Sequence, residues 1–307
     1  MSKAESIKAR IKQVAVKENK PFDYLLMHYF IERLLYRISI SNHADNFILK
    51  GGLFLYTILG NDARATKDVD LLARQINNTL EDLQKIFIDI CSIQCDDAVI
   101  FDTSSIFTER IKEFAEYEGV RVKVIGYLDR TRHILQLDIG FGDVIVPKIK
   151  EMEYPSILDM DRVSIKTYSI ESVIAEKFEA MIYLSEANSR MKDFYDIYSL
   201  CKEFDFDGRV LYEAVLQTFA KRVTPTPIAP TVFSEEFPNM KDKQTQWKAF
   251  QRRVKSASSL EFTVVIYVIK LFLQPIYYCV LEEREFFGQW NCKSGEWCSG
   301  RNNEEVI

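Results

Sequence analysis

The sequence has 307 residues, of which 47% are hydrophobic and 28% are charged, and its formal net charge is −5. This length allows two compact domains, and the composition excludes a wholly disordered chain. The negative net charge excludes a generally basic coat that would bind nucleic acid through charge alone, although it is compatible with a local basic face.

The first residues predict two helices and two short segments that follow them. Apolar side chains recur at spacings of three and four over residues 4–16 and 22–40, which is typical of amphipathic helices, the second more buried than the first. Residues 47–59 are short and apolar and finish at Gly60, a residue that suits a helix C-terminus. Residues 69–73 then predict a strand.

The middle of the chain predicts a β-sheet. Residues 80–92 show the helical period, whereas residues 98–107, 120–128 and 133–141 show β-branched or alternating patterns. Turns that contain glycine or aspartate separate these three segments. We therefore expect a sheet with flanking helices in this part of the chain.

The second half of the chain is predicted to be helical. The period becomes helical from Ser169 onward, apart from a proline-rich loop at residues 224–240. Residues 262–281 are apolar enough to reach across a bilayer, but they include a lysine, a glutamine and Pro275. We expect a buried helix that ends near this proline, and no membrane partner. The change of pattern places a domain boundary near residue 165.

These patterns divide the chain into three parts. We expect a first domain over residues 1–165, a mostly α-helical domain over residues 166–285, and a tail over residues 286–307 whose composition indicates partial disorder. The six cysteines are scattered and the start of the chain shows no signal-peptide pattern, so we expect a protein of the reducing cytoplasm. Cys91 and Cys95 lie close together, but no nearby Cys or His pair completes a zinc set.

Two aspartates at the strand over residues 69–73 form the first candidate site. One apolar residue separates Asp68 from Asp70, so the strand period of two puts both carboxylates on one face, roughly 7 Å apart at Cα. Protonating one carboxylate or binding a divalent cation relieves their repulsion, and Mg²⁺ or Mn²⁺ suits an all-oxygen site. Two solvated acids at a strand end are the other interpretation.

A pair of glycines and a third aspartate add to this candidate site. Gly51 and Gly52 open a helix just before the strand, where residues without side chains let a phosphate approach backbone N–H groups at a helix N-terminus. Close helix packing or a tight turn would explain the glycines equally well. Asp138 interrupts an apolar strand face, and burial of an unpaired charge is costly. A cation shared with the acid pair and a bond to a loop both stay open for Asp138.

A lysine in the helical half is a candidate for phosphate binding. Lys177 lies within the apolar stripe of the helix that Ser169 can cap, so its ammonium needs an anionic partner or a route to water. A triphosphate would provide that partner, while snorkelling or a salt bridge to an acid are the alternatives. On the next helix Asp193 and Asp196 share one face, where one of them can orient Lys177 or both can be ordinary solvated acids.

As a set, four segments resemble the AbiEii/AbiGii toxin family of the nucleotidyltransferase superfamily, over residues 47 to about 280. The segments are Lys50-Gly51-Gly52, Arg64-Ala65-Thr66-Lys67-Asp68-Val69-Asp70, Ala175-Glu176-Lys177 and Lys192-Asp193-Phe194-Tyr195-Asp196. The resemblance implies an α/β (α+β) fold, in which a nucleotidyltransferase-like mixed β-sheet flanked by helices precedes a mostly α-helical domain that completes the active-site cleft.

The resemblance also implies roles for individual residues. It implies a metal site at Asp68, Asp70 and Asp138, and catalytic roles for these residues together with Lys177 and Asp193. The nucleotide-binding residues would be Lys50, Gly51, Gly52, Arg64, Thr66 and Lys177. Many nucleotidyltransferases have Gly-Ser where this chain has two glycines, so the missing hydroxyl leaves only backbone contacts to phosphate from that position.

The function implied by the resemblance is that of a metal-dependent nucleotidyltransferase toxin, of EC 2.7.7 type. Such an enzyme transfers NMP from NTP to an acceptor, which in related toxins is the tRNA 3′ end, and releases pyrophosphate. The chain would be the toxin half of a bacterial toxin–antitoxin or phage-defence pair, with an antitoxin, often of winged-helix type, encoded nearby. Transfer onto a protein hydroxyl and a non-catalytic module that binds NTP or a partner are the alternatives.

Overall fold

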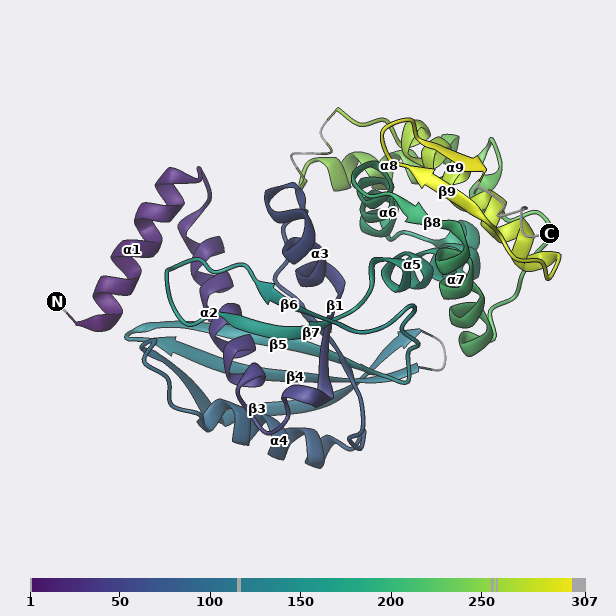
Figure 1. Ribbon diagram of the computed structural model, residues 1–307. Coiled ribbons are helices and arrows are strands. Elements are labelled where there is room, and N and C mark those ends of the chain that lie inside the picture. Colours follow the sequence, from purple (N-terminus) through teal and green to yellow (C-terminus); the bar gives the residue numbers. More distant parts are fainter. Residues whose placement is uncertain (1, 115–116, 255–256, 258, 300–307) are drawn as a thin grey trace, which may run out of the picture. The chain divides into compact units, whose positions relative to one another are not determined.

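The computed structural model describes residues 2–114, 117–254, 257 and 259–299 (Figure 1). The chain forms two compact units: Met1–Asp143 with Ile149–Tyr168, and Val144–Lys148 with Ser169–Ile307. Two serines of the second unit hold the short segment Val144–Lys148 in that unit. The hydroxyl of Ser172 accepts from the Val146 N–H at 2.8 Å, and the Ser169 hydroxyl donates to the Val146 carbonyl.

The first unit is built on a seven-stranded mixed sheet, in the order β3-β4-β5-β2-β1-β7-β6. Its strands are β1 (Phe47–Lys50), β2 (Val69–Ala73), β3 (Val99–Phe114), β4 (Tyr117–Leu128), β5 (Thr131–Phe141), β6 (Lys150–Tyr154) and β7 (Val163–Thr167). Strand β2 runs antiparallel to β1 and parallel to β5, and β1 runs parallel to β7. The expected mixed sheet with flanking helices is therefore confirmed.

Four helices accompany this sheet: α1 (Lys3–Lys17), α2 (Phe22–Ser39), α3 (Gly51–Leu59) and α4 (Leu80–Ser92). Helices α2 and α4 pack against each other and against strands of one sheet face (Figure 1). That face is apolar because alternate residues of each strand, such as Leu71, Val122 and Leu137, are buried on it. The polar residues between them consequently stand on the opposite face.

Helix α2 is tied to the sheet by a buried ion pair. The Arg37 guanidinium donates to both carboxylate oxygens of Asp97, at 2.7 and 3.1 Å, and to the Val99 carbonyl at 3.0 Å. A bidentate pair of this kind fixes orientation as well as charge. The helix that carries His28, discussed below, is thus held in one position relative to the first strand of the hairpin β3–β4.

The second unit is mostly helical and ends in a small sheet. Its main helices are α5 (Ile170–Leu184), α6 (Met191–Glu203), α7 (Gly208–Arg222), α8 (Lys241–Gln251) and α9 (Phe262–Leu281), and β9 (Gly288–Asn291) pairs with β8 (Phe206–Asp207) and β10 (Glu296–Ser299). Strands β9 and β10 lie in the expected tail. Trp290 on β9 is buried and donates its indole N–H to the Cys201 carbonyl at 2.7 Å. Residues 300–307 of that tail lie outside the described residues.

Helix α9 differs from its prediction in length. Among the described residues it is the one helix long and apolar enough to cross a membrane, and it buries one side against α6 and α7, as the core helices of globular domains also do. The expectation that it ends near Pro275 is wrong, because the helix continues to Leu281. The proline removes one hydrogen bond, and the packing of Phe272, Leu273 and Ile276 in the core offsets that loss.

Candidate active site

A row of charged residues crosses the polar face of the sheet. Neighbouring members of the row are paired across adjacent strands, so their side chains stand on the same face. In strand order the row is Glu109 on β3, Arg121 on β4, Asp138 on β5, Asp70 on β2 and Lys50 on β1. The sheet therefore brings together three of the residues that the sequence predicts for the site, and adds Arg121 and Glu109.

Asp70 lies directly against the start of helix α3. A Cβ atom at Gly51 would come within 1.9 Å of the Asp70 Oδ2 atom, and the φ angle of Gly51 is +66°, in the region that favours glycine. The carboxylate is half-buried at a helix N-terminus, where the helix dipole stabilises negative charge. The sequence predicts both groups, and the structure shows that the glycine makes room for the acid.

The second glycine makes room for Thr66. A Cβ atom at Gly52 would lie 2.8 Å from Thr66 Oγ1, so the threonine hydroxyl occupies space beside the position that carries a serine in many nucleotidyltransferases. Thr66 is buried, in the loop directly before β2. Its backbone carbonyl accepts from His28 Nε2 on α2 at 3.0 Å.

His28 had no predicted role, and its only sequence signal is a histidine within the buried stripe of a helix. The ring is 1% exposed and packs between Tyr24 and Tyr56, with ring centroids 4.3 and 5.2 Å away. Burial lowers the pKa of His28 to about 4, although the bond to the Thr66 carbonyl acts in the opposite direction. The neutral ring therefore anchors the loop that leads to Asp68.

We predict that this histidine makes stability depend on pH. In the unfolded chain a histidine takes up a proton near pH 6.5, whereas folded His28 stays neutral down to about pH 4. The unfolded state binds more protons in this window, so the free energy of unfolding should fall by about 3 kcal/mol as pH drops from 6.5 to 4, and should lose no more from this source below it. Urea unfolding of wild type and His28→Gln at several pH values measures this contribution, because glutamine can still donate to the carbonyl but does not titrate.

His28→Phe serves as the second variant, since it also lacks the titration but cannot donate the hydrogen bond. Both variants should show a flatter dependence on pH than the wild type, and the phenylalanine variant should be the less stable of the two at pH 7. Slopes equal to that of the wild type in both variants would contradict the prediction.

The predicted third carboxylate has a partner that the sequence analysis missed. Arg121 Nε and Nη2 donate to Asp138 Oδ1 and Oδ2, each at 2.8 Å. The hydrogen bond to Asp138 raises the pKa of Arg121. This partner is a side chain on the neighbouring strand β4, not the loop that was one of the two alternatives. The available signal was the alternation of valine with Arg121 and Lys123 along β4.

The other predicted residues of the first unit take different places. Asp68 is exposed and lies just before the first residue of β2. Lys50 is buried, 2.7 Å from Asp143 Oδ2, and its ammonium lies over the ring of Tyr168. Arg64 lies half-buried in the loop before Thr66. Lys50 thus already has an anionic partner in its own unit.

The donor chemistry of the acid pair fits a cation that arrives with a nucleotide. Across the described ranges, no three Asp, Glu, His or Cys side chains are grouped to hold a metal ion. Mg²⁺ is usually bound through one or two carboxylates together with substrate phosphates and water. Asp70 on β2 and the exposed Asp68 just before that strand supply carboxylate oxygens of this kind. Both oxygens of Asp138 accept hydrogen bonds from Arg121.

The lysine of the second unit is held by two aspartates. Lys177 Nζ lies 2.7 Å from Asp193 Oδ1 and 2.9 Å from Asp196 Oδ2, and Arg190 pairs with the other Asp193 oxygen. Burial alone would raise the pKa of Asp193, but the charges of Lys177 and Arg190 lower it to about 2. The apolar position of Lys177 is thus satisfied by ion pairs within its own unit, and both acids orient it.

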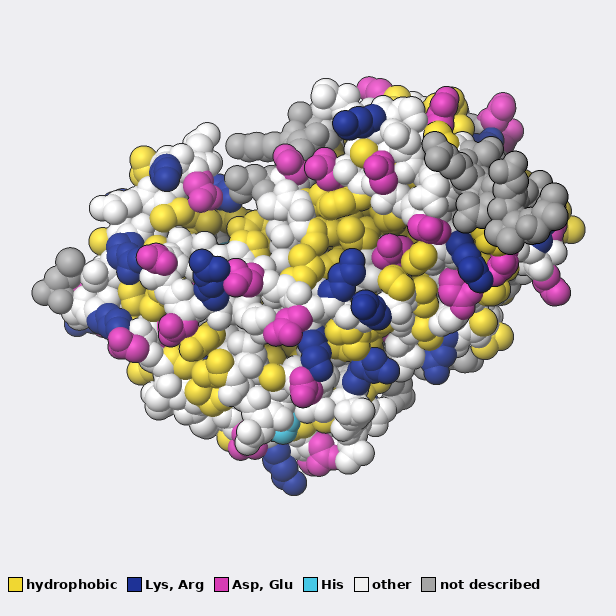
Figure 2. Space-filling model, in the orientation of Figure 1, with side chains coloured by type: hydrophobic (Ala, Val, Ile, Leu, Met, Phe, Trp, Pro, Cys, Tyr) yellow, Lys and Arg dark blue, Asp and Glu magenta, His cyan; other side chains and the backbone are white. Residues whose placement is uncertain are grey.

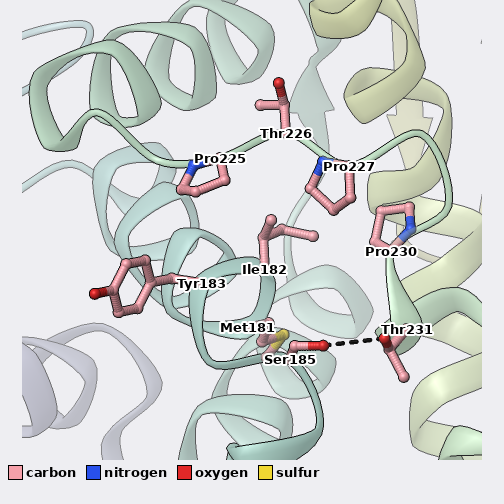
Figure 3. A pocket seen from close by; sticks show the side chains of 9 residues that line it. All are labelled: Met181, Ile182, Tyr183, Ser185, Pro225, Thr226, Pro227, Pro230 and Thr231. Atoms are coloured by element: carbon pink, nitrogen blue, oxygen red, sulfur yellow. Dashed lines mark hydrogen bonds between the residues drawn. The ribbon is translucent and has the colours of Figure 1, made fainter.

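A cavity in the second unit lies away from these residues. It has a volume of about 350 Å³ between the end of α5 and the proline-rich loop, and the hydroxyls of Ser185 and Thr231 bond across it at 3.0 Å (Figure 3). Its described lining residues do not include Lys177 or Asp193. Figure 2 shows basic and acidic side chains interspersed on the visible face.

Comparisons with known proteins identify the family. The model of a family described as the nucleotidyl transferase AbiEii toxin of type IV toxin–antitoxin systems matches residues 33–266. Because the match spans well over half of the sequence, the chain belongs to the AbiEii nucleotidyltransferase toxin family, and the predicted resemblance is confirmed. A comparison with curated proteins finds no match.

Two solved structures from Helicobacter pylori are similar to this chain. JHP933 shares 14% sequence identity, with a TM-score of 0.48 over 85% of this chain and 94% of its own. A candidate nucleotidyltransferase shares 13% identity, with a TM-score of 0.48 over 86% of this chain and 99% of its own.

Proposed function

We propose that this chain is a metal-dependent nucleotidyltransferase toxin that transfers NMP from NTP to the 3′ end of tRNA and releases pyrophosphate. The observation that supports this most is the contact of the Asp70 carboxylate with the glycine start of α3, in a chain of the AbiEii family. We further propose that it acts in the bacterial cytoplasm, in phage defence, and that an antitoxin, of winged-helix type, is encoded nearby.

In this proposal Asp68 and Asp70 hold Mg²⁺ or Mn²⁺, which would neutralise charge on the nucleotide phosphates. Backbone N–H groups of Gly51 and Gly52 bind phosphate oxygens at the N-terminus of α3. The acceptor hydroxyl bonds to the α-phosphorus, the bond from that phosphorus to the bridging oxygen breaks, and pyrophosphate leaves. Once its contact with Arg121 is released, Asp138 would complete the metal site and help to remove the proton of the hydroxyl.

The remaining predicted residues have supporting roles in the proposal. Lys177 binds phosphate oxygens of the nucleotide in exchange for one of its two carboxylate partners, and Asp193 keeps the ammonium oriented. Lys50, Arg64 and Thr66 support the loop and the helix start that face the nucleotide.

Label transfer tests the proposed function directly. Purified protein is incubated with each α-³²P-labelled NTP, total tRNA, and Mg²⁺ or Mn²⁺, and the products are separated by size. We expect label on RNA with one or more NTPs, and none when the tRNA has first been oxidised with periodate, which destroys the 3′-terminal diol. Label on a protein band would favour a protein hydroxyl as acceptor. Absence of label with every NTP and metal would leave a non-catalytic binding module.

A further inference from the structure

The third carboxylate of the candidate site, Asp138, forms an ion pair with Arg121 on the neighbouring strand. Both oxygens of Asp138 accept from the Arg121 guanidinium at 2.8 Å, in the fork geometry that is strongest for this pair. With its side-chain amide turned to accept, Gln136 also presents its oxygen to Arg121 Nε and Nη2, at 3.1 and 3.2 Å. The side chain of Asp138 is 16% exposed and that of Arg121 is 30% exposed, so water screens this pair in part.

Arg121 has a second acid beside it on the other flank. Glu109 on β3 is paired in register with Arg121 across the hairpin, and its carboxylate lies 2.8 Å from the ammonium of Lys123. Residues paired in this way have Cβ atoms about 5 Å apart. The guanidinium can therefore leave Asp138 and still lie near the Glu109 carboxylate. Its positive charge is then not left without a negative neighbour.

We propose that Arg121 is a positioning residue that keeps Asp138 out of the metal site until a nucleotide phosphate draws the guanidinium away. Without nucleotide the protein would then offer a cation only Asp68 and Asp70, and the charge of Arg121 would repel it. With nucleotide, Asp138 becomes available as the third carboxylate. This inference rests on the proposed function for the identity of the anion, but the state without nucleotide can be tested by itself.

The test uses Mn²⁺ alone and the full chain. Titration followed by electron paramagnetic resonance gives the Kd for Mn²⁺ in the absence of nucleotide. Arg121→Gln should tighten binding about tenfold, because a carboxylate is freed and a nearby positive charge is lost. Lys123→Gln is the matched control, since this lysine stands on the same face of β4 with similar exposure, 37% against 30%, and pairs with Glu109. It should change Kd less than about twofold, because its charge is not bonded to Asp138.

A double variant separates the freed carboxylate from the lost charge. Asp138→Asn alone should weaken Mn²⁺ binding less than Asp70→Asn does, and only because it leaves the Arg121 charge without its partner. Arg121→Gln with Asp138→Asn should lose the gain of the single arginine variant. Arg121→Lys keeps the charge but can hold only one oxygen, so it should lie between wild type and Arg121→Gln. Thermal unfolding of each variant checks that the fold is retained, and the lysine variant carries the test if the glutamine variant does not fold.

Three results would overturn the proposal, two of them without nucleotide and one with a nucleotide analogue. One is a loss of Mn²⁺ affinity in Asp138→Asn as large as in Asp70→Asn, which would make Asp138 a ligand from the start. The second is a Kd for Mn²⁺ in Arg121→Gln that is no lower than in Lys123→Gln. Absence of saturable Mn²⁺ binding in both variants counts as this result. A nucleotide analogue that cannot be cleaved between the α- and β-phosphates should make Mn²⁺ binding sensitive to Asp138→Asn; insensitivity would also count against the proposal.

Failure of the proposed function gives a different pattern. Label transfer by the wild type, together with a failed Mn²⁺ series, removes the role of Arg121 and leaves the transferase. If the Mn²⁺ series gives the expected results but no label is transferred under any condition, the proposed transferase activity is refuted. The metal site and the role of Arg121 beside it then remain.

Discussion

Replacing Asp70 with asparagine is expected to lower the initial rate of label transfer by about a thousandfold while the protein stays folded. Asparagine has nearly the shape of aspartate, so the contact with the start of α3 is kept. It lacks the charge that would hold a divalent cation, and loss of a metal ligand removes several kcal/mol of transition-state stabilisation. The measurement is the initial rate with saturating NTP and tRNA, accompanied by thermal unfolding.

Asp62→Asn is the control for this prediction, because Asp62 is an exposed acid of the segment between α3 and β2. It should transfer label at the rate of the wild type. In growing cells the wild-type chain should arrest growth, Asp70→Asn should not, and the product of a neighbouring antitoxin gene should restore growth. An Asp70→Asn variant that arrests growth as the wild type does would refute a catalytic basis for toxicity.

The glycine start of α3 could be predicted because it depends on local rules: a glycine pair before a short apolar helix indicates a crowded helix start. The strand period that was expected to put Asp68 and Asp70 on one face applies only from Val69 onward, because Asp68 lies just before β2. Gly60 ends α3 as its position predicted, with a φ of +58°. These features need no knowledge of which strands are neighbours.

Arg121 could not be predicted in the same way, since its role depends on strand pairing. It meets Asp138 because β4 and β5 form a hairpin in which these two residues are in register. A shift of one residue would have turned Arg121 to the apolar face. The alternation along β4 showed that Arg121 and Lys123 share a face, but not which acid either one meets.

Three strands of the seven-stranded sheet, β1, β6 and β7, were not predicted from the sequence. The sequence analysis treated residues 47–59 as one apolar segment, whereas β1 ends at Lys50 and α3 begins at Gly51. Strands β6 (Lys150–Tyr154) and β7 (Val163–Thr167) lie before and at the expected domain boundary. Each has only two apolar side chains, which is too few for a strand pattern to stand out. In the structure β1 lies between β2 and β7, so the helix start that faces Asp70 is fixed by strands on both sides.

Gly51→Ala should separate the role of the glycine in backbone conformation from its role in making room for Asp70. Gly51 and Gly60 both have positive φ angles, +66° and +58°, so alanine at either position costs about 1–3 kcal/mol of stability. A Cβ atom at Gly60 meets nothing within 4 Å, whereas at Gly51 it meets the Asp70 carboxylate at 1.9 Å. Only Gly51→Ala must therefore displace the acid.

In urea unfolding we expect the free energy of unfolding to fall in both variants, because both positions have positive φ angles. The fall should be larger in Gly51→Ala because of the added clash with Asp70. Transfer activity should remain near the wild-type rate in Gly60→Ala and fall about a hundredfold in Gly51→Ala, since a displacement of about 1 Å at a reacting centre can cost that much. Equal activity in the two variants would mean that the position of Asp70 relative to α3 does not matter for transfer. The contact between glycine and carboxylate would then be a feature of folding, and the case for catalysis would have to rest on the charge of the acid pair alone.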